Sequence, residues 1–143
     1  MVIVAAVDRS ERATPVIEQA AVLAEKFDDP VHAVHVMKRS EVVGAQSEGA
    51  NRGEISNVEE IREEAAQVAT EALEAATIGV ESEAVGRIGT PADEIVEYAA
   101  EQSARYIVVS PHRRSQAGKI LFGSVAQSVL LNADCPVVSV RSD

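Results

Sequence analysis

The residues best suited to chemistry lie in the C-terminal third of the chain, in a stretch without acidic residues. Residues 103–133 contain no Asp or Glu, although the whole chain has 23 acidic residues and a net charge of −10. Four cations stand in this stretch: Arg105, Arg113, Arg114 and Lys119. A local cationic field in an acidic chain favours an anionic ligand.

Gly123 and Ser124 strengthen this prediction because they stand at the start of an expected helix. A helix N-terminus offers unpaired backbone N–H groups and a partial positive charge, and glycine lets a phosphate approach closely. The hydroxyl of Ser124 adds a donor. The alternative is that Ser124 only caps the helix and that the basic residues form a solvated face.

Asp8 and the three histidines are further candidates. The Asp8 carboxylate stands at the end of a buried strand, where it would either accept hydrogen bonds from a ligand or tie down the following helix. His112 has no nucleophile or orienting carboxylate beside it in sequence, which disfavours catalysis. His32 and His35 project to opposite faces of an expected strand, so we predict structural roles and no shared metal.

Other phosphate motifs fit poorly. A P-loop ending at Gly118 and Lys119 would need Gly in place of Arg113 and Ser or Thr in place of Ile120, which excludes a P-loop NTPase. No G-x-G-x-x-G follows the first apolar run. A receiver domain would need an Asp where residues 86–89 read GRIG, so phospho-transfer signalling is disfavoured.

The elements that position these residues alternate between strands and helices. Apolar and β-branched runs predict strands at residues 2–7, 31–37, 80–85, 106–109 and 136–141. Periodic apolar residues and capping signals predict helices at residues 11–27, from Ser56, from Pro91 after a Thr90 cap, and at 124–131 after a Ser124 cap. The second of these helices has an apolar stripe of Val58, Ile61, Ala65, Val68, Ala72 and Ala76.

This alternation implies one α/β domain over residues 1–143, a doubly wound parallel sheet with right-handed crossovers. Residues 38–55 lack a sustained period and are predicted as a flexible loop. Ligands of such sheets bind beyond the carboxyl ends of the strands. Asp8 and residues 110–113 stand at two of those ends.

Composition limits the partners and the compartment. An acidic chain with four aromatic residues is a poor binder of nucleic acid or anionic membranes. No apolar run is long enough to span a bilayer and no signal peptide opens the chain, so we expect a cytoplasmic protein. Cys135 is the only cysteine, and we interpret it as a small buried hydrophobe.

The chain resembles the universal stress protein family over almost its full length. The matching segments are VIVAAVDRS, HAVHV, RIGTPADEIVEYA, YIVVS, LFGSVAQSVL and CPVVSV. The resemblance implies an adenine nucleotide alpha hydrolase-like fold with five parallel strands in the order 3-2-1-4-5 and helices on both faces. It also implies a homodimer paired through the last strand.

ATP-binding members of that family carry G-x2-G-x9-G-[ST] after the fourth strand. Gly123 and Ser124 match its end, but Ser110 and Arg113 replace the earlier glycines. A side chain at either position crowds the space for the ribose and phosphates. The planar guanidinium of Arg113 would, however, donate two hydrogen bonds to a phosphate. The resemblance implies these nucleotide-binding residues: Ala6, Val7, Asp8, Val36, Val109, Ser110, Arg113, Gly123, Ser124 and Val125.

Three functions follow from these observations. The first is a non-catalytic stress-response regulator that binds an adenine nucleotide, ATP or AMP, with or without Mg²⁺. The second is a stress-response dimer that binds no ATP and acts through an unidentified protein partner, since Pro111 stiffens the loop that replaces the glycines. The third is a slow ATP hydrolase, with Asp8 or His112 as the only local groups to activate water.

Overall fold

The computed structural model describes residues 1–42, 58–114 and 120–141. Its centre is a parallel sheet of β1 (Ile3–Ala6), β2 (Val31–Met37), β3 (Ser82–Ile88), β4 (Tyr106–Val109) and β7 (Val137–Ser139). The strands lie in the order β3-β2-β1-β4-β7, which is the predicted order 3-2-1-4-5. The sheet prediction is therefore confirmed.

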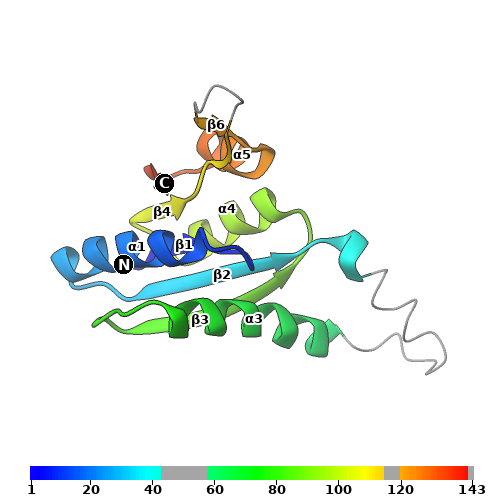
Figure 1. Ribbon diagram of the computed structural model, residues 1–143, viewed down its shortest axis with the longest axis horizontal. Helices are drawn as coiled ribbons and strands as arrows, with labels where there is room; N and C mark the ends of the chain where they lie inside the picture. Colours follow the sequence, from blue (N-terminus) through cyan, green and yellow to red (C-terminus); the bar gives the residue numbers. More distant parts are fainter. Residues whose placement is uncertain (43–57, 115–119, 142–143) are drawn as a thin grey trace.

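Helices cover both faces of the sheet (Figure 1). On one face, α1 (Ala13–Phe27) and α3 (Val58–Ala75) pack against Ile3, Ala5 and Val108. On the other face, α4 (Pro91–Glu101) and α5 (Ser124–Asn132) pack against Val4 and Ile107. The central strand β1 is buried on both faces because its residues alternate between these two cores.

Several predicted boundaries shift. The third strand begins at Ser82 and runs to Ile88, because residues 82–88 pair continuously with Val31–Met37 of β2. The last strand covers only Val137–Ser139, and α1 begins at Ala13. Val58 is 47% exposed and does not belong to the apolar stripe of α3.

The capping and loop predictions have mixed outcomes. Gly123 is the N-cap of α5, so Ser124 is its first helical residue and not its cap. Thr90 occupies the N-cap of α4, but its side chain makes no capping hydrogen bond. Residues 39–42, inside the predicted loop, are helical. Residues 43–57, including Ser56, lie outside the described residues.

An antiparallel hairpin between β4 and α5 was not predicted. It consists of β5 (His112–Arg114) and β6 (Ile120–Phe122), with Arg113 opposite Leu121. The backbone N–H of Gly123 donates to the Pro111 carbonyl at 2.8 Å, which ties the end of the hairpin to its beginning. The hairpin therefore delivers Gly123 and the start of α5 to the end of β4.

A buried carboxylate, Asp29, joins the chain segments that lead into β1, β2 and β4, at the amino ends of these strands. Asp29 is 7% exposed and accepts a hydrogen bond from Arg105 Nε at 2.7 Å. The N-terminal amine lies 3.4 Å from its other oxygen. The hydrogen bond from Arg105 holds the pKa of Asp29 below its ordinary value of 3.8. The charged form of Asp29 therefore stabilises the fold.

Asp29→Asn should lower the free energy of unfolding by about 2 kcal/mol at pH 7, since a charge-assisted hydrogen bond to a buried group is lost. The contribution of Asp29 is full above pH 3.8 and is lost as pH falls through the lowered pKa of the folded state. Urea unfolding from pH 2 to pH 7 measures this, and the variant should have a flatter acid limb. Asp28→Asn is the matched control, because Asp28 is exposed and its left-handed backbone (φ 57°) suits Asn. An equal loss in both variants would contradict the assignment.

Candidate functional site

A pocket of about 350 Å³ opens at the carboxyl ends of β1, β2 and β4. This is the edge at which parallel α/β sheets bind their ligands, and the volume lies in the range of small-molecule sites. Eight of the predicted nucleotide-binding residues line it: Ala6, Val7, Asp8, Val36, Val109, Ser110, Ser124 and Val125. The sequence therefore predicted residues that the fold brings together.

The other two predicted residues stand differently. Gly123 is not among the lining residues, but it immediately precedes Ser124 and accepts the first helical hydrogen bond, from Gln127 N–H at 3.0 Å. The backbone of Arg113 belongs to β5, and its side chain lies outside the described part of the structure. Hydrogen bonding between the Arg113 guanidinium and a phosphate stays a prediction.

Asp8 both shapes the turn after β1 and lines the pocket. Its Oδ1 accepts hydrogen bonds from the Ser10 N–H at 2.8 Å and the Ser10 hydroxyl at 2.5 Å. The hydroxyl oxygen of Ser10 in turn accepts from the Arg12 N–H at 3.2 Å. The structure thus bears out the turn role for Asp8, and it leaves the carboxylate on the pocket wall.

The start of α5 forms the other end of the pocket. Ser124 and Val125 are its first two residues and both line the pocket. The first backbone N–H groups of a helix have no partner within the helix and carry a partial positive charge. This end of the pocket therefore suits an anion.

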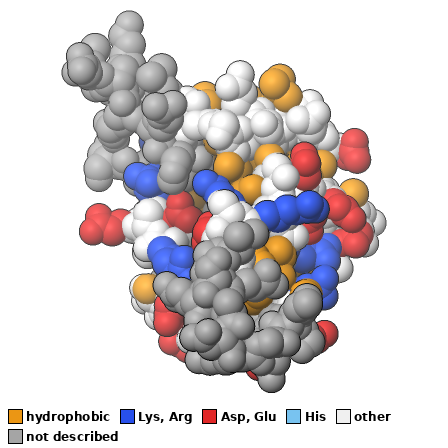
Figure 2. Space-filling view, turned by 90° about the vertical axis from the view of Figure 1, so that its right-hand side faces the viewer, with side chains coloured by type: hydrophobic (Ala, Val, Ile, Leu, Met, Phe, Trp, Pro, Cys, Tyr) orange, Lys and Arg blue, Asp and Glu red, His pale blue; other side chains and the backbone are white. Residues whose placement is uncertain are grey.

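The sequence did not predict the wall beneath α1. Arg9, Arg12, His35, Lys38 and Glu41 line the pocket there. Arg9 and Lys38 follow β1 and β2 closely, so the rule that selected Asp8 would also have selected them. Figure 2 shows this edge of the sheet, where Lys and Arg side chains surround an apolar area and alternate with acidic ones.

Several polar atoms of the pocket wall are unpaired. Within the described residues, four buried side-chain atoms have no hydrogen-bond partner: Arg12 Nε, His35 Nε2, Arg87 Nε and Ser110 Oγ. Three of these residues, all except Arg87, line the pocket. Buried polar groups are normally hydrogen-bonded, so the residues around this pocket hold polar atoms that the described part of the chain does not pair.

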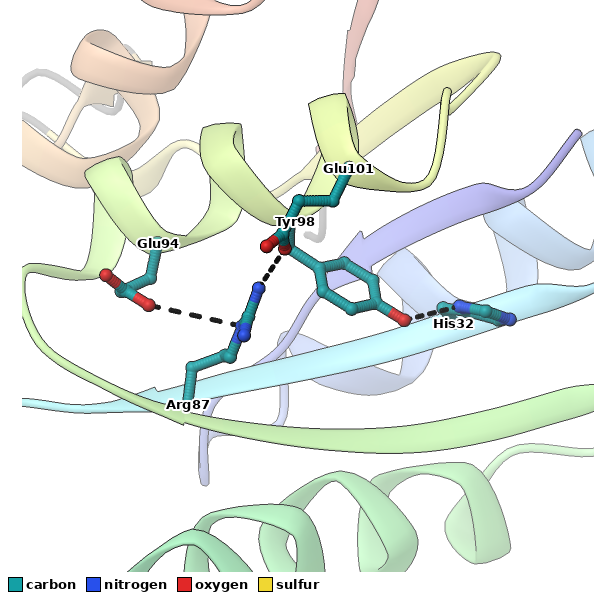
Figure 3. A network of polar contacts seen from close by, with 5 residues as sticks. All are labelled: His32, Arg87, Glu94, Tyr98 and Glu101. Atoms are coloured by element: carbon teal, nitrogen blue, oxygen red, sulfur yellow. Dashed lines mark hydrogen bonds and ion pairs between the residues drawn. The ribbon is translucent and has the colours of Figure 1, made fainter.

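A polar network fixes α4, which contributes Pro91 and Ile95 to the pocket wall (Figure 3). Arg87 of β3 forms an ion pair with Glu101 and lies 4.0 Å from a Glu94 oxygen. Its guanidinium lies 5.2 Å from the centre of the Tyr98 ring. The network thereby joins β3 to three positions along α4.

Tyr98 extends this network to β2. Nε2 of His32 lies 3.3 Å from a Glu83 oxygen, and a carboxylate can only accept, so Nε2 carries the proton. In the neutral ring Nδ1 then accepts from the Tyr98 hydroxyl at 2.6 Å, and burial raises the pKa of Tyr98 to about 12. The structural role predicted for His32 is confirmed. His35 also makes a structural contact, since its Nδ1 lies 2.9 Å from the Val7 carbonyl oxygen, and it lines the pocket as well.

The described residues contain no group of three or more His, Cys, Asp or Glu side chains that would hold a metal ion. None of the helices described is long and apolar enough to cross a membrane.

The comparisons with known proteins agree with one another. The model of the universal stress protein family matches residues 1–141. A universal stress protein of Methanocaldococcus jannaschii is 32% identical over 139 residues, which cover 97% of this chain and 81% of the relative. These two findings concern sequence alone.

Solved structures give the same result. A universal stress protein of Archaeoglobus fulgidus is 30% identical, with a TM-score of 0.62 over 98% of this chain and 97% of that one. A universal stress protein from the same organism in complex with dAMP is 27% identical, with a TM-score of 0.58 over 98% and 96%. The fold is the adenine nucleotide alpha hydrolase-like fold, and the chain belongs to the universal stress protein family.

Proposed function

We propose that the pocket binds an adenine nucleotide and that the chain is a non-catalytic regulator of a stress response. The observation that carries this proposal is the pocket itself, which gathers eight predicted nucleotide-binding residues at the carboxyl ends of β1, β2 and β4. The complex of an Archaeoglobus fulgidus relative with dAMP supports the ligand class. Bound nucleotide would alter contacts with a partner, and no chemical step is needed.

The walls of the pocket match the parts of a nucleotide. Ala6, Val36 and Ile95 provide apolar surface for a base. The carboxylate of Asp8 accepts hydrogen bonds from ribose hydroxyls. The first N–H groups of α5, at Ser124 and Val125, donate to a phosphate.

The lost glycines limit how tightly the phosphates are held. The Gly123 N–H already donates to Pro111, so it is not available to a phosphate. Ser110 lines the pocket, and its buried hydroxyl has no partner among the described residues, so a rotation of this side chain would offer a donor to the phosphate. We therefore expect binding of AMP through the first phosphate, with ATP and its Mg²⁺ as a second candidate and Asp8 facing the metal through water.

The proposal includes a cytoplasmic homodimer paired through β7. This strand is at the edge of the sheet, and no other strand in the described part of the chain pairs with its outer side. Leu131 of α5, the helix that precedes β7, is 72% exposed. An open strand edge and an exposed leucine on the preceding helix are features that a second copy would cover.

A titration with AMP, followed by amide NMR spectra of ¹⁵N-labelled protein, tests the nucleotide site. We expect saturable shifts at residues 6–8, 110 and 123–125, because these residues surround the proposed ligand. Amides of residues 68–75 in α3, which do not line the pocket and lie outside the proposed dimer interface, serve as the internal reference. Shifts scattered over the surface, or none at millimolar AMP, would exclude this site.

A further inference from the structure

Three cations line the pocket on the side of α1. Arg9 and Arg12 belong to the turn between β1 and α1, and Lys38 directly follows β2. Because β1 and β2 are parallel neighbours in the sheet, the turns that follow them meet at one edge. The pocket therefore has a second cationic region besides the N-terminus of α5.

A carboxylate of the chain already occupies this region. Oε2 of Glu41 lies 3.9 Å from Arg9 Nη1, and Oε1 of Glu41 accepts a hydrogen bond from the Lys38 N–H at 3.4 Å. Glu41 therefore marks a position at which an anion reaches a guanidinium from one turn and a backbone donor from the other.

The Glu41 carboxylate is held weakly. Both distances are long for charge-assisted contacts. The side chains of Arg9 and Glu41 are 63% and 40% exposed, and an exposed ion pair stabilises little because water competes for both charges. An anionic group of a ligand would displace Glu41 at small cost.

A phosphate suits this region better than one carboxylate. Within the described residues, Arg12 and Lys38 form no ion pair, and Lys38 is exposed. The three cations face two carboxylates in the lining, Asp8 and Glu41, so the wall is locally positive in a chain with a net charge of −10. A phosphate monoester offers several acceptor oxygens and carries about two negative charges at neutral pH.

The ribose of a nucleotide would present such a phosphate here. In the site proposed above, the 5′-phosphate lies at the start of α5 and a ribose hydroxyl donates to Asp8. Arg9 follows Asp8 in the chain and has a long, exposed side chain, so a phosphate on the other ribose hydroxyl is within its reach. The first hydroxyl keeps Asp8 as its acceptor.

We propose that the pocket accepts a nucleoside bisphosphate, whose second phosphate, on the ribose 2′ or 3′ oxygen, binds Arg9 and Lys38 in place of Glu41. In the free protein, Glu41 occupies this subsite. The inference rests on the nucleotide binding proposed above and adds a second anion to the ligand.

The experiment compares three ligands by calorimetry at neutral pH and low ionic strength. They are AMP, adenosine 3′,5′-bisphosphate and adenosine 2′,5′-bisphosphate. The proteins are the wild type, Arg9→Gln, Glu41→Gln and Arg39→Gln. The last is the matched control, because Arg39 is exposed in the helical turn after β2 and does not line the pocket.

Wild-type protein should bind one of the two bisphosphates about tenfold more tightly than AMP, because charge-assisted hydrogen bonds are gained. This preference should fall below about twofold in Arg9→Gln and should persist in Arg39→Gln. Glu41→Gln keeps an acceptor for the Lys38 N–H and removes the competing charge. Its preference for the bisphosphate should therefore rise by about threefold over the wild-type value.

A wild type that binds neither bisphosphate more tightly than AMP would overturn the inference, whatever the variants do. An Arg9→Gln variant that keeps the preference would also overturn it, as would equal losses in Arg9→Gln and Arg39→Gln, which would reveal an effect of net charge alone. A Glu41→Gln variant without a gain would contradict the displacement of Glu41. In each case AMP still binds and the proposed function stands, whereas a wild type that binds none of the three ligands overturns both.

Discussion

Replacing Gly86 with alanine should lower the free energy of unfolding by more than about 3 kcal/mol, the upper end of overpacking costs. A Cβ atom at Gly86 would lie 2.1 Å from the Arg62 oxygen and 2.4 Å from the Ala66 nitrogen. Both atoms belong to the backbone of α3, so no side-chain rotation relieves the clash. Helix α3 would have to move away from β3, and it would lose packing along its whole length. Urea unfolding of both proteins measures the difference.

Gly79→Ala is the matched control for this prediction. A Cβ at Gly79 would meet no atom within 4 Å. The free energy of unfolding of Gly79→Ala should therefore stay within about 0.5 kcal/mol of the wild-type value. If Gly86→Ala were as stable as Gly79→Ala, the close approach of α3 to β3 would be wrong.

Ser124→Glu should weaken AMP binding at least a hundredfold without loss of stability. The new carboxylate would stand in the first turn of α5, beside the proposed phosphate. Two like charges about 4 Å apart near a protein surface repel by about 4 kcal/mol. The same carboxylate interacts favourably with the positive end of the helix, so the fold should be retained. Calorimetry at low ionic strength and thermal unfolding give the two quantities.

Gln127→Glu is the control that separates repulsion of the phosphate at the start of α5 from an effect of the net charge of the chain on AMP affinity. It adds the same charge to α5 at an exposed position that does not line the pocket. AMP affinity should change less than threefold, because solvent and salt screen this charge. Equal losses in Ser124→Glu and Gln127→Glu would mean that the phosphate does not lie at the start of α5.

The sheet could be predicted because four of its five strands, all except β3, are largely apolar runs in a sheet that helices cover on both faces. The strand at residues 31–37 was predicted to the residue, since all of its side chains are buried. The third strand was misplaced because Gly86 and Arg87 suggest a loop, whereas seven consecutive pairs with β2 keep them in the strand. Tertiary pairing overrides local propensity there.

The hairpin after β4 could not be predicted from periodicity. Its strands have three residues each, too few for an alternating pattern to stand out. The hairpin changes the site because the Gly123 N–H donates to the Pro111 carbonyl. In the family motif this N–H would be a donor to phosphate.

Eight of the nineteen residues that line the pocket were predicted from the sequence. The rule that ligands bind beyond strand ends, together with the family motif, gave the residues around Asp8, Ser110 and Ser124. The polar contacts of His35 could not be predicted, because no motif encodes them. Its Nδ1 is committed to the Val7 carbonyl, and its Nε2 is left without a partner among the described residues.

The most direct test of nucleotide binding is a calorimetric titration of wild-type protein, stripped of ligands by unfolding and refolding, with AMP and with ATP and Mg²⁺. We expect one site per chain and a dissociation constant for AMP below about 0.1 mM, which corresponds to about 5.5 kcal/mol. No heat of binding with either ligand at millimolar concentration would contradict the proposed function and would favour a dimer that acts through a protein partner.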